Sequence, residues 1–106
     1  AGAPPAKRRR VAAAEALKVA VVGGAGRIGL PLSLVLADCG HSVVVVDRNE
    51  AKLEAMRGGS FPFLDPGGPA LLRRCLADCP ERLALTADCS AVASCDVIVI
   101  TIGTPV

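Results

Sequence analysis

The chain has 106 residues, which is room for one small domain or for part of a larger one. Hydrophobic residues make up 52% of it and aromatic residues only 2%, with no Trp and no Tyr, so the core must be aliphatic and recognition of nucleic acid by base stacking is disfavoured. The net charge is only +2, and the chain beyond the basic cluster Lys7–Arg10 is slightly acidic, so we expect no nucleic-acid partner. No apolar run approaches the roughly 18 residues of a membrane span, so we expect no membrane partner.

The first expected elements are a leader, a strand and a helix. Residues 1–16 are rich in Ala, Pro and Arg and predict a flexible leader, with order beginning near Leu17. Val19–Val22 is a continuous apolar run, which is typical of a strand buried on both faces. A helix is expected over residues 27–39, with Pro31 in its first turn and Gly40 as its stop. Its apolar positions fall on one helical face at Ile28, Leu32, Val35, Leu36 and Cys39.

A second strand and a second helix follow directly. Val43–Val46 predicts the strand, which ends at Asp47. Asn49 is suited to cap a helix over Glu50–Arg57, and the glycine pair at 58–59 ends that helix.

A third helix lies beyond a Pro- and Gly-rich segment at residues 60–68. Pro69 can open this helix, and Pro80 ends it. Its inner face is expected to carry Leu71, Leu72, Cys75, Leu76 and Cys79.

Two more strands complete the pattern. Leu83–Thr86 predicts the third strand, residues 88–93 a short helix, and Val97–Ile102 the fourth strand. Strands that alternate with helices form right-handed βαβ units, so the fold class is α/β, a Rossmann-type doubly wound parallel sheet. A complete sheet of this kind has about six strands, so we expect residues 17–106 to be the N-terminal part of a dinucleotide-binding domain.

A glycine-rich loop connects the first strand to the first helix and matches the Gly-x-Gly-x-x-Gly pattern of dinucleotide-binding proteins. We expect Gly24 to allow a tight turn, Gly26 to let a pyrophosphate approach the backbone, and Gly29 to let the helix pack close to the sheet. The N–H groups of the first helical turn then face the phosphates, whose charge the helix dipole favours. The structural alternative is a turn that only packs helix on strand.

Polar residues around this loop predict the choice of cofactor. Asp47 closes the second strand and should accept hydrogen bonds from the adenine ribose hydroxyls, which favours NAD over NADP because a carboxylate repels a 2′-phosphate. Arg48 beside it keeps NADP open, since an arginine there can accommodate that phosphate. Lys52 either contacts the adenosine end or is a surface lysine. Gly103 and Thr104 follow the fourth strand at the topological switch point and should line the nicotinamide side.

The cysteines do not form a metal-binding or disulfide pattern. Their number is odd, no Cys-x-x-Cys occurs, and His41 is the single histidine, so a zinc site is disfavoured. We expect reduced, structural thiols in a cytoplasmic protein at Cys39, Cys75, Cys79, Cys89 and Cys95.

Residues 18–106 resemble the N-terminal part of the UDP-glucose/GDP-mannose dehydrogenase family. The resemblance lies in three pieces: the stretch Lys18–Asp47, the segment Phe61–Gly67 with the helix after it, and the stretch Val97–Pro105. Within the second piece family members usually carry Pro-x-x-Glu-Pro-Gly-Leu, whereas this chain has Asp65 in place of Glu and Gly68 in place of Leu.

This resemblance implies the NAD-binding portion of an enzyme that oxidises the C6 alcohol of a UDP-sugar to the uronic acid with two NAD. The ending at residues 101–106 is most similar to members that act on UDP-N-acetylmannosamine and related amino sugars. Lys52 and Thr104 match family residues that contact NAD, and Arg27 and Ile28 match loop positions whose backbone contacts the pyrophosphate.

The resemblance also implies what this chain does not contain. The family's catalytic cysteine, which holds the aldehyde-level intermediate covalently, and the lysine and asparagine that assist it lie beyond residue 106. We therefore expect no catalytic residue within the chain and no activity from the chain alone. The nucleotide-sugar substrate is bound through the missing domains, and the full-length protein is expected to be a homo-oligomer.

Two other interpretations fit parts of the sequence. The stretch from Gly40 to Lys52 also suits 3-hydroxyacyl-CoA and β-hydroxyacid dehydrogenases, although the Phe61–Gly67 segment argues against them. The glycine loop and the end of the second strand also resemble nucleotide-sensing domains that regulate potassium transport. Those domains usually carry a Gly-Asp-Ala-Thr-like stretch after the third strand, where this chain has residues 85–88 instead.

Overall fold

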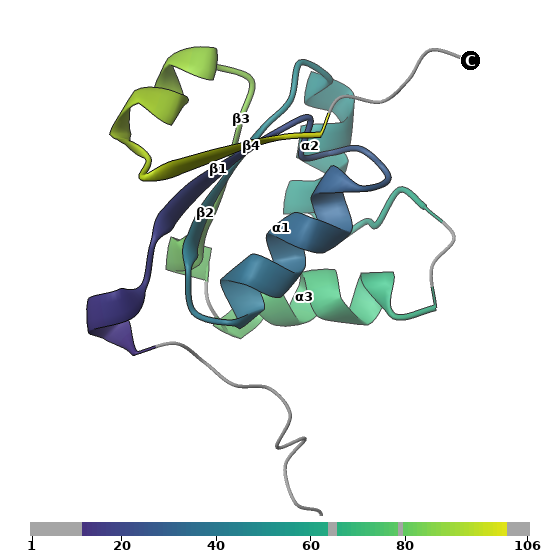
Figure 1. Cartoon of the computed structure of the whole chain (residues 1–106). Coiled ribbons are helices and arrows are strands. Elements are labelled where there is room, and N and C mark those ends of the chain that lie inside the picture. Colours follow the sequence, from purple (N-terminus) through teal and green to yellow (C-terminus); the bar gives the residue numbers. More distant parts are fainter. Residues whose placement is uncertain (1–11, 64–65, 79, 102–106) are drawn as a thin grey trace, which may run out of the picture.

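The computed structural model of the chain describes residues 12–63, 66–78 and 80–101 (Figure 1). Its elements are η1 (Ala13–Glu15), β1 (Lys18–Val22), α1 (Gly29–Asp38), β2 (Ser42–Val46), α2 (Glu50–Arg57), α3 (Gly68–Asp78), η2 (Pro80–Arg82), β3 (Leu83–Thr86), η3 (Cys89–Ser94) and β4 (Val97–Ile100), where η denotes a 3-10 helix. Within the described ranges the strands form one sheet in the order β3-β2-β1-β4, and each pairing is parallel. This confirms the predicted fold class, α/β with a Rossmann-like parallel sheet.

Most element boundaries agree with the sequence prediction to within two residues. α2 and β3 begin and end where expected. α1 begins at Gly29, two residues later than predicted, because the chain first makes a turn in which the Gly26 N–H donates to the carbonyl oxygen of Gly23 (3.0 Å). β4 ends at Ile100. Residue 102, the predicted end of that strand, lies outside the described residues.

The short helix that we expected over residues 88–93 is present as the 3-10 helix η3. Cys95 donates its N–H to the carbonyl oxygen of Val92 (3.1 Å), which is an i→i+3 bond. The segment has six residues, and 3-10 geometry is common in pieces of this length. Near the start of the described residues, η1 is a single 3-10 turn that precedes Leu17.

The main hydrophobic core lies between the sheet and the three α-helices, which cover the same face (Figure 1). Alternate strand residues point into it, as the two-residue period of a strand requires. Val21 and Val45 from the central strands are fully buried there, together with Leu53 of α2 and Leu72 of α3. Burial of these aliphatic side chains is the largest favourable term in folding.

The opposite face of the sheet is covered unevenly. Val44 and Val46 of β2 are buried on it, and η3 lies on this side (Figure 1). Ile98 and Ile100 of β4 share this face in the sheet register, yet they remain 49% and 64% exposed. Among the described residues, β4 therefore forms an exposed apolar edge of the sheet.

α1 buries the apolar stripe that the sequence spacing indicated only in part: Leu32, Leu36 and Cys39 are half-buried, and Leu36 packs against the core. Ile28, at the turn before the helix, and Val35 are 73% and 49% exposed, whereas the buried positions of the helix are Gly29, Leu30, Ser33, Leu34, Ala37 and Asp38. The helix is apolar around most of its circumference, so spacing alone does not define which face turns inward. Small residues decide it: a Cβ at Gly29 would collide with the Gly23 carbonyl oxygen and the Thr101 hydroxyl.

α3 follows its prediction more closely. Leu72 and Cys75 are buried, and Leu71 and Leu76 are partly buried against the core. Cys79, the last residue predicted on this face, lies outside the described residues. Across the described ranges, none of the helices has the length and apolar character needed to cross a bilayer.

Candidate functional site

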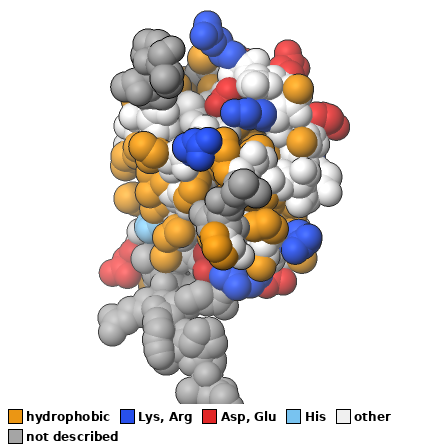
Figure 2. All heavy atoms as spheres, turned by 90° about the vertical axis from the view of Figure 1, so that its right-hand side faces the viewer, with side chains coloured by type: hydrophobic (Ala, Val, Ile, Leu, Met, Phe, Trp, Pro, Cys, Tyr) orange, Lys and Arg blue, Asp and Glu red, His pale blue; other side chains and the backbone are white. Residues whose placement is uncertain are grey.

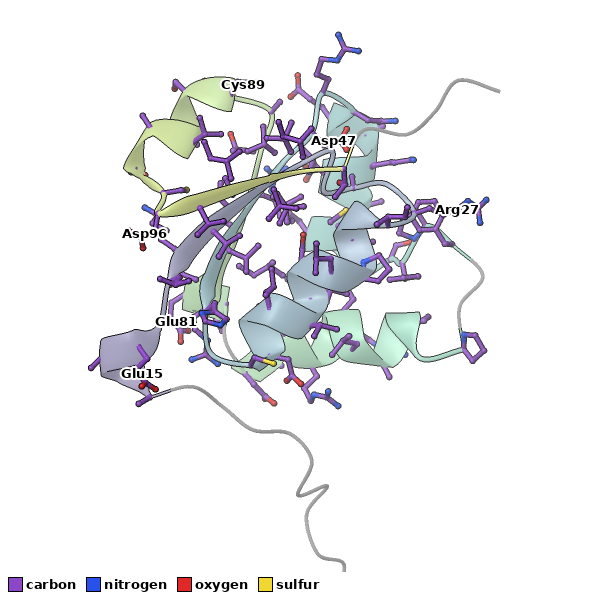
Figure 3. All side chains as sticks on the ribbon, viewed as in Figure 1. Glu15, Arg27, Asp47, Glu81, Cys89 and Asp96 are labelled. Atoms are coloured by element: carbon purple, nitrogen blue, oxygen red, sulfur yellow. The ribbon has the colours of Figure 1, made fainter. Side chains whose placement is uncertain are left out.

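The candidate site lies where the carboxyl ends of the parallel strands meet. β1 and β2 run side by side in register, and β4 pairs with the other edge of β1, so their ends come together at one end of the sheet. Figure 3 shows Asp47 and Arg27 at this end, whereas Glu15, Glu81 and Asp96 lie toward the amino ends of the strands. Open α/β sheets bind ligands outside the carboxyl ends of their strands, at the point where the strand order reverses.

The glycine loop is held by the end of β2 and by close packing. The N–H groups of Gly23 and Gly24 donate to the carbonyl oxygen of Val46 at 2.8 and 3.3 Å. The turn spans residues 23–26 and contains Gly24, as expected, whereas the positive φ (+84°) falls at Gly23. Gly24 is also required for packing, because a Cβ on it would lie 2.7 Å from the Val45 side chain and 2.8 Å from the Val21 carbonyl oxygen.

The other two glycines of the loop have different surroundings. Gly29 brings α1 against the loop and the end of β4, as described above, which agrees with its predicted packing role. A Cβ on Gly26 would meet only the Gly23 carbonyl oxygen, at 3.2 Å, so the remaining space beside Gly26 is open to a ligand. α1 begins three residues later. Leu30 and Leu32 already donate their N–H groups to the carbonyl oxygens of Gly26 (3.0 Å) and Ile28 (3.3 Å), and Pro31 has no N–H, so the N–H groups that can face a ligand are those before Leu30 and not, as expected, those of the first helical turn. The residues present therefore fit a diphosphate at this loop.

Asp47 is attached directly to the glycine loop. Its Oδ2 accepts the N–H of Ala25 at 3.0 Å, and its Oδ1 accepts the N–H of Asn49 at 2.9 Å. Each carboxylate oxygen has two lone pairs, so Asp47 can still accept bonds from ribose hydroxyls. The Asn49 side chain in turn accepts the Lys52 N–H at 3.1 Å, which caps α2 as predicted.

Thr101 is a residue of this site that the sequence reasoning missed. Its Oγ1 lies 3.1 Å from the carbonyl oxygen of Val22 and 3.2 Å from that of Gly23, and its N–H donates to Val22 as well. The hydroxyl thus ties the end of β4 to the start of the glycine loop. Its signal in the sequence was a threonine at the end of the fourth strand. We expected Gly103 and Thr104 to line the nicotinamide side instead, and both lie outside the described residues.

The structure brings two predicted basic residues together on an aromatic ring. The Cζ of Arg27 lies 5.2 Å from the centre of the Phe63 ring, and the Nζ of Lys52 lies 5.1 Å from the same point. Ile28 and Arg48, which were also expected near the cofactor, have exposed side chains. Phe63 had been noted only as part of the family resemblance.

One carboxyl group near the carboxyl ends of the strands has a shifted pKa. Asp88 follows β3, and its side chain accepts the backbone N–H of Ser90 at 2.9 Å. Hydrogen bonding to the Ser90 backbone N–H, and then to the Ser90 side chain, lowers the pKa of Asp88 below its ordinary value of 3.8. Asp88 therefore caps η3 as a carboxylate at neutral pH.

Comparison with known proteins agrees with this geometry. The UDP-glucose/GDP-mannose dehydrogenase family, NAD binding domain, matches residues 17–106. A UDP-glucose 6-dehydrogenase of Rhizobium meliloti (strain 1021) is 40% identical over 90 residues, which are 84% of this chain and 20% of that protein.

Two solved structures are similar to the described fold. A UDP-glucose dehydrogenase from Pyrobaculum islandicum superposes with a TM-score of 0.79 at 30% identity, over 90% of this chain and 22% of that one. A UDP-N-acetyl-mannosamine dehydrogenase from Staphylococcus aureus gives a TM-score of 0.72 at 30% identity, over 83% and 20%. The chain thus spans about a fifth of the length of the relatives it matches.

Proposed function

The chain belongs to the UDP-glucose/GDP-mannose dehydrogenase family and corresponds to its NAD-binding domain, and we propose that it supplies the cofactor site of an enzyme that oxidises the C6 alcohol of a UDP-sugar to the uronic acid. The observation that carries the proposal is the attachment of the glycine loop to the ends of three parallel strands. β2 contributes Asp47, and Thr101 follows β4. The match over residues 17–106 favours this function over the 3-hydroxyacyl-CoA, β-hydroxyacid and potassium-transport alternatives.

The sugar is proposed to be of the UDP-glucose or UDP-N-acetylmannosamine type. Relatives of both kinds match the chain, and the UDP-glucose 6-dehydrogenase of Rhizobium meliloti is 40% identical. Conversion of a primary alcohol to a carboxylate removes four electrons, and each NAD accepts two, so one sugar consumes two NAD. We propose that the residues that carry out this chemistry lie outside residues 1–106, in the rest of a longer enzyme. The substrate domain and the oligomer contacts are proposed to lie there as well.

Within this chain we propose that Asp47 binds the adenine ribose hydroxyls and that the backbone at Gly26 and Ile28 faces the diphosphate. Gly103 and Thr104 are proposed to line the nicotinamide side. A cytoplasmic location is part of the proposal, because Cys39, Cys89 and Cys95 are free thiols, which suit a reducing compartment.

The proposal is tested by calorimetric titration of the chain with NAD and NADP. We expect saturable NAD binding and weaker NADP binding. Asp47→Ala should weaken NAD binding by about tenfold or more, since a hydrogen bond to a charged group contributes about 1.5–3 kcal/mol. Asp47→Asn keeps one acceptor oxygen but removes the charge that repels a 2′-phosphate, so it should narrow the preference for NAD over NADP.

Asp96→Asn is a matched control. The Asp96 Oδ2 also accepts a backbone N–H, that of Lys18 at 2.8 Å, but at the opposite end of the sheet (Figure 3). This variant should bind both nucleotides as the unchanged chain does. A folded chain that binds neither nucleotide, or one whose preference is the same with and without the Asp47 charge, would contradict the proposal.

A further inference from the structure

Phe63 contacts two cationic side chains that come from separate parts of the chain. Arg27 belongs to the glycine loop, and Lys52 lies in the first turn of α2. Their charged groups lie 5.2 and 5.1 Å from the centre of one phenyl ring, within the range of a cation–π interaction. Figure 2 shows the molecule from the right-hand side of Figure 1, where basic side chains lie among hydrophobic ones.

The ring is held in place by its own contacts. Phe61 and Phe63 meet edge to face, with ring centres 6.0 Å apart and an interplanar angle of 82°. Phe61 packs against the backbone of Gly68 at the start of α3, where a Cβ would collide with its ring. Both phenylalanines are partly buried against the hydrophobic core. The ring is therefore a fixed support, whereas arginine and lysine side chains are long and have many rotamers.

Two positive charges near one another repel, and each loses conformational freedom when it is localised. The negative face of an aromatic ring offsets both effects. Lys52 is placed further by its helix, because Asn49 caps α2 and donates its own N–H to Asp47. The loop carrying Arg27 is tied to the same Asp47 through Ala25. The two cations and the carboxylate thus form one connected edge of the site.

We infer that Phe63 is a positioning residue for the cofactor: it holds the side chains of Arg27 and Lys52 beside the glycine loop, where their charges attract the diphosphate. This inference rests on the proposed NAD function and adds a role for side chains to a site otherwise built from backbone N–H groups. Groups that are arranged before the ligand arrives lower the entropic cost of binding. The ring acts through the cations and not by stacking on the adenine.

The test compares NAD, ADP and adenosine as ligands of the full chain. Phe63→Leu keeps an apolar side chain without a π face, and Phe63→Tyr keeps the face. We expect Phe63→Leu to weaken NAD and ADP binding by about fivefold, to reduce the salt dependence of both, and to change adenosine binding by less than about twofold. Phe63→Tyr should retain the original affinities.

A double-mutant cycle separates positioning from a general structural effect. Arg27→Met and Lys52→Met should each weaken ADP binding in the original chain but much less in the Phe63→Leu background. Arg73→Met is the matched control, since it removes an exposed positive charge on α3 whose side chain lies beside Gly59. If Phe63→Leu does not fold, as judged by far-UV circular dichroism, Phe63→Met takes its place in the cycle.

Equal losses for ADP and adenosine would overturn the inference, because they would indicate adenine stacking or a disturbed pocket. Additive effects in the cycle would overturn it as well. If the chain binds NAD and the folded Phe63 variants bind it equally well, the inference fails and the proposed function stands. If the folded, unchanged chain binds no NAD, the proposed function itself fails.

Discussion

Replacement of Thr101 by valine removes the hydroxyl that ties β4 to the glycine loop and preserves most of the side-chain shape. The two carbonyl oxygens within reach of that hydroxyl keep other donors. Val22 still accepts the Thr101 N–H at 2.8 Å, and Gly23 still accepts the Gly26 N–H at 3.0 Å. The variant therefore loses one net hydrogen bond, about 1 kcal/mol, and its melting temperature should fall by about 4–8 °C in a domain of this size.

The same change should weaken NAD binding by at most about fivefold, which is the equivalent of 1 kcal/mol, because the hydroxyl is bonded to the Val22 and Gly23 carbonyl oxygens and acts by positioning the loop. Thermal unfolding followed by circular dichroism and calorimetric titration with NAD measure the two effects. Thr86→Val is the matched control: its hydroxyl accepts the Asp88 N–H at 3.0 Å at the end of β3 and does not contact the loop. The reasoning is refuted if Thr101→Val melts at the original temperature, or if both variants weaken NAD binding equally.

Two further predictions concern stability. Gly29→Ala should destabilise the chain by about 1–3 kcal/mol in urea unfolding, because the added Cβ meets backbone and the Thr101 hydroxyl. Gly67→Ala is the control: its Cβ would have open space around it, so the urea midpoint should stay unchanged. Equal midpoints for the two variants would contradict the packing argument. The lowered pKa of Asp88 means that its capping of η3 is complete above the ordinary value of 3.8 and is lost as the pH falls through the lowered pKa. The amide resonance of Ser90 should therefore stay constant from about pH 5 to 8 and shift only in stronger acid, and a transition near neutral pH would show that another group controls this cap.

The elements defined by local signals were predictable. α2 begins after an Asn49 cap and ends at a glycine pair, and both signals act within a few residues, so its bounds were found correctly. Gly40 was likewise identified as the stop of α1 and adopts φ +111° there. The strand–loop–helix order with Asp47 at the end of β2 led to the Rossmann-like fold, because each part of that pattern is contiguous in the chain.

The inward face of α1 was not predictable, since an almost uniformly apolar helix has no preferred side until it packs. Gly29 determines that side only because the end of β4, more than 70 residues later in the chain, comes within contact distance.

The sequence by itself determined the fold class, the glycine loop and its acidic partner, because these depend on short-range pattern and on the two-residue and 3.6-residue periods. Tertiary structure alone decided how the loop is held and which side chains surround it. Thr101 meets Gly23 across 78 residues, and Arg27 and Lys52 meet on Phe63. Such contacts exist only after parallel strands align their carboxyl ends, and no local spacing in the chain encodes them.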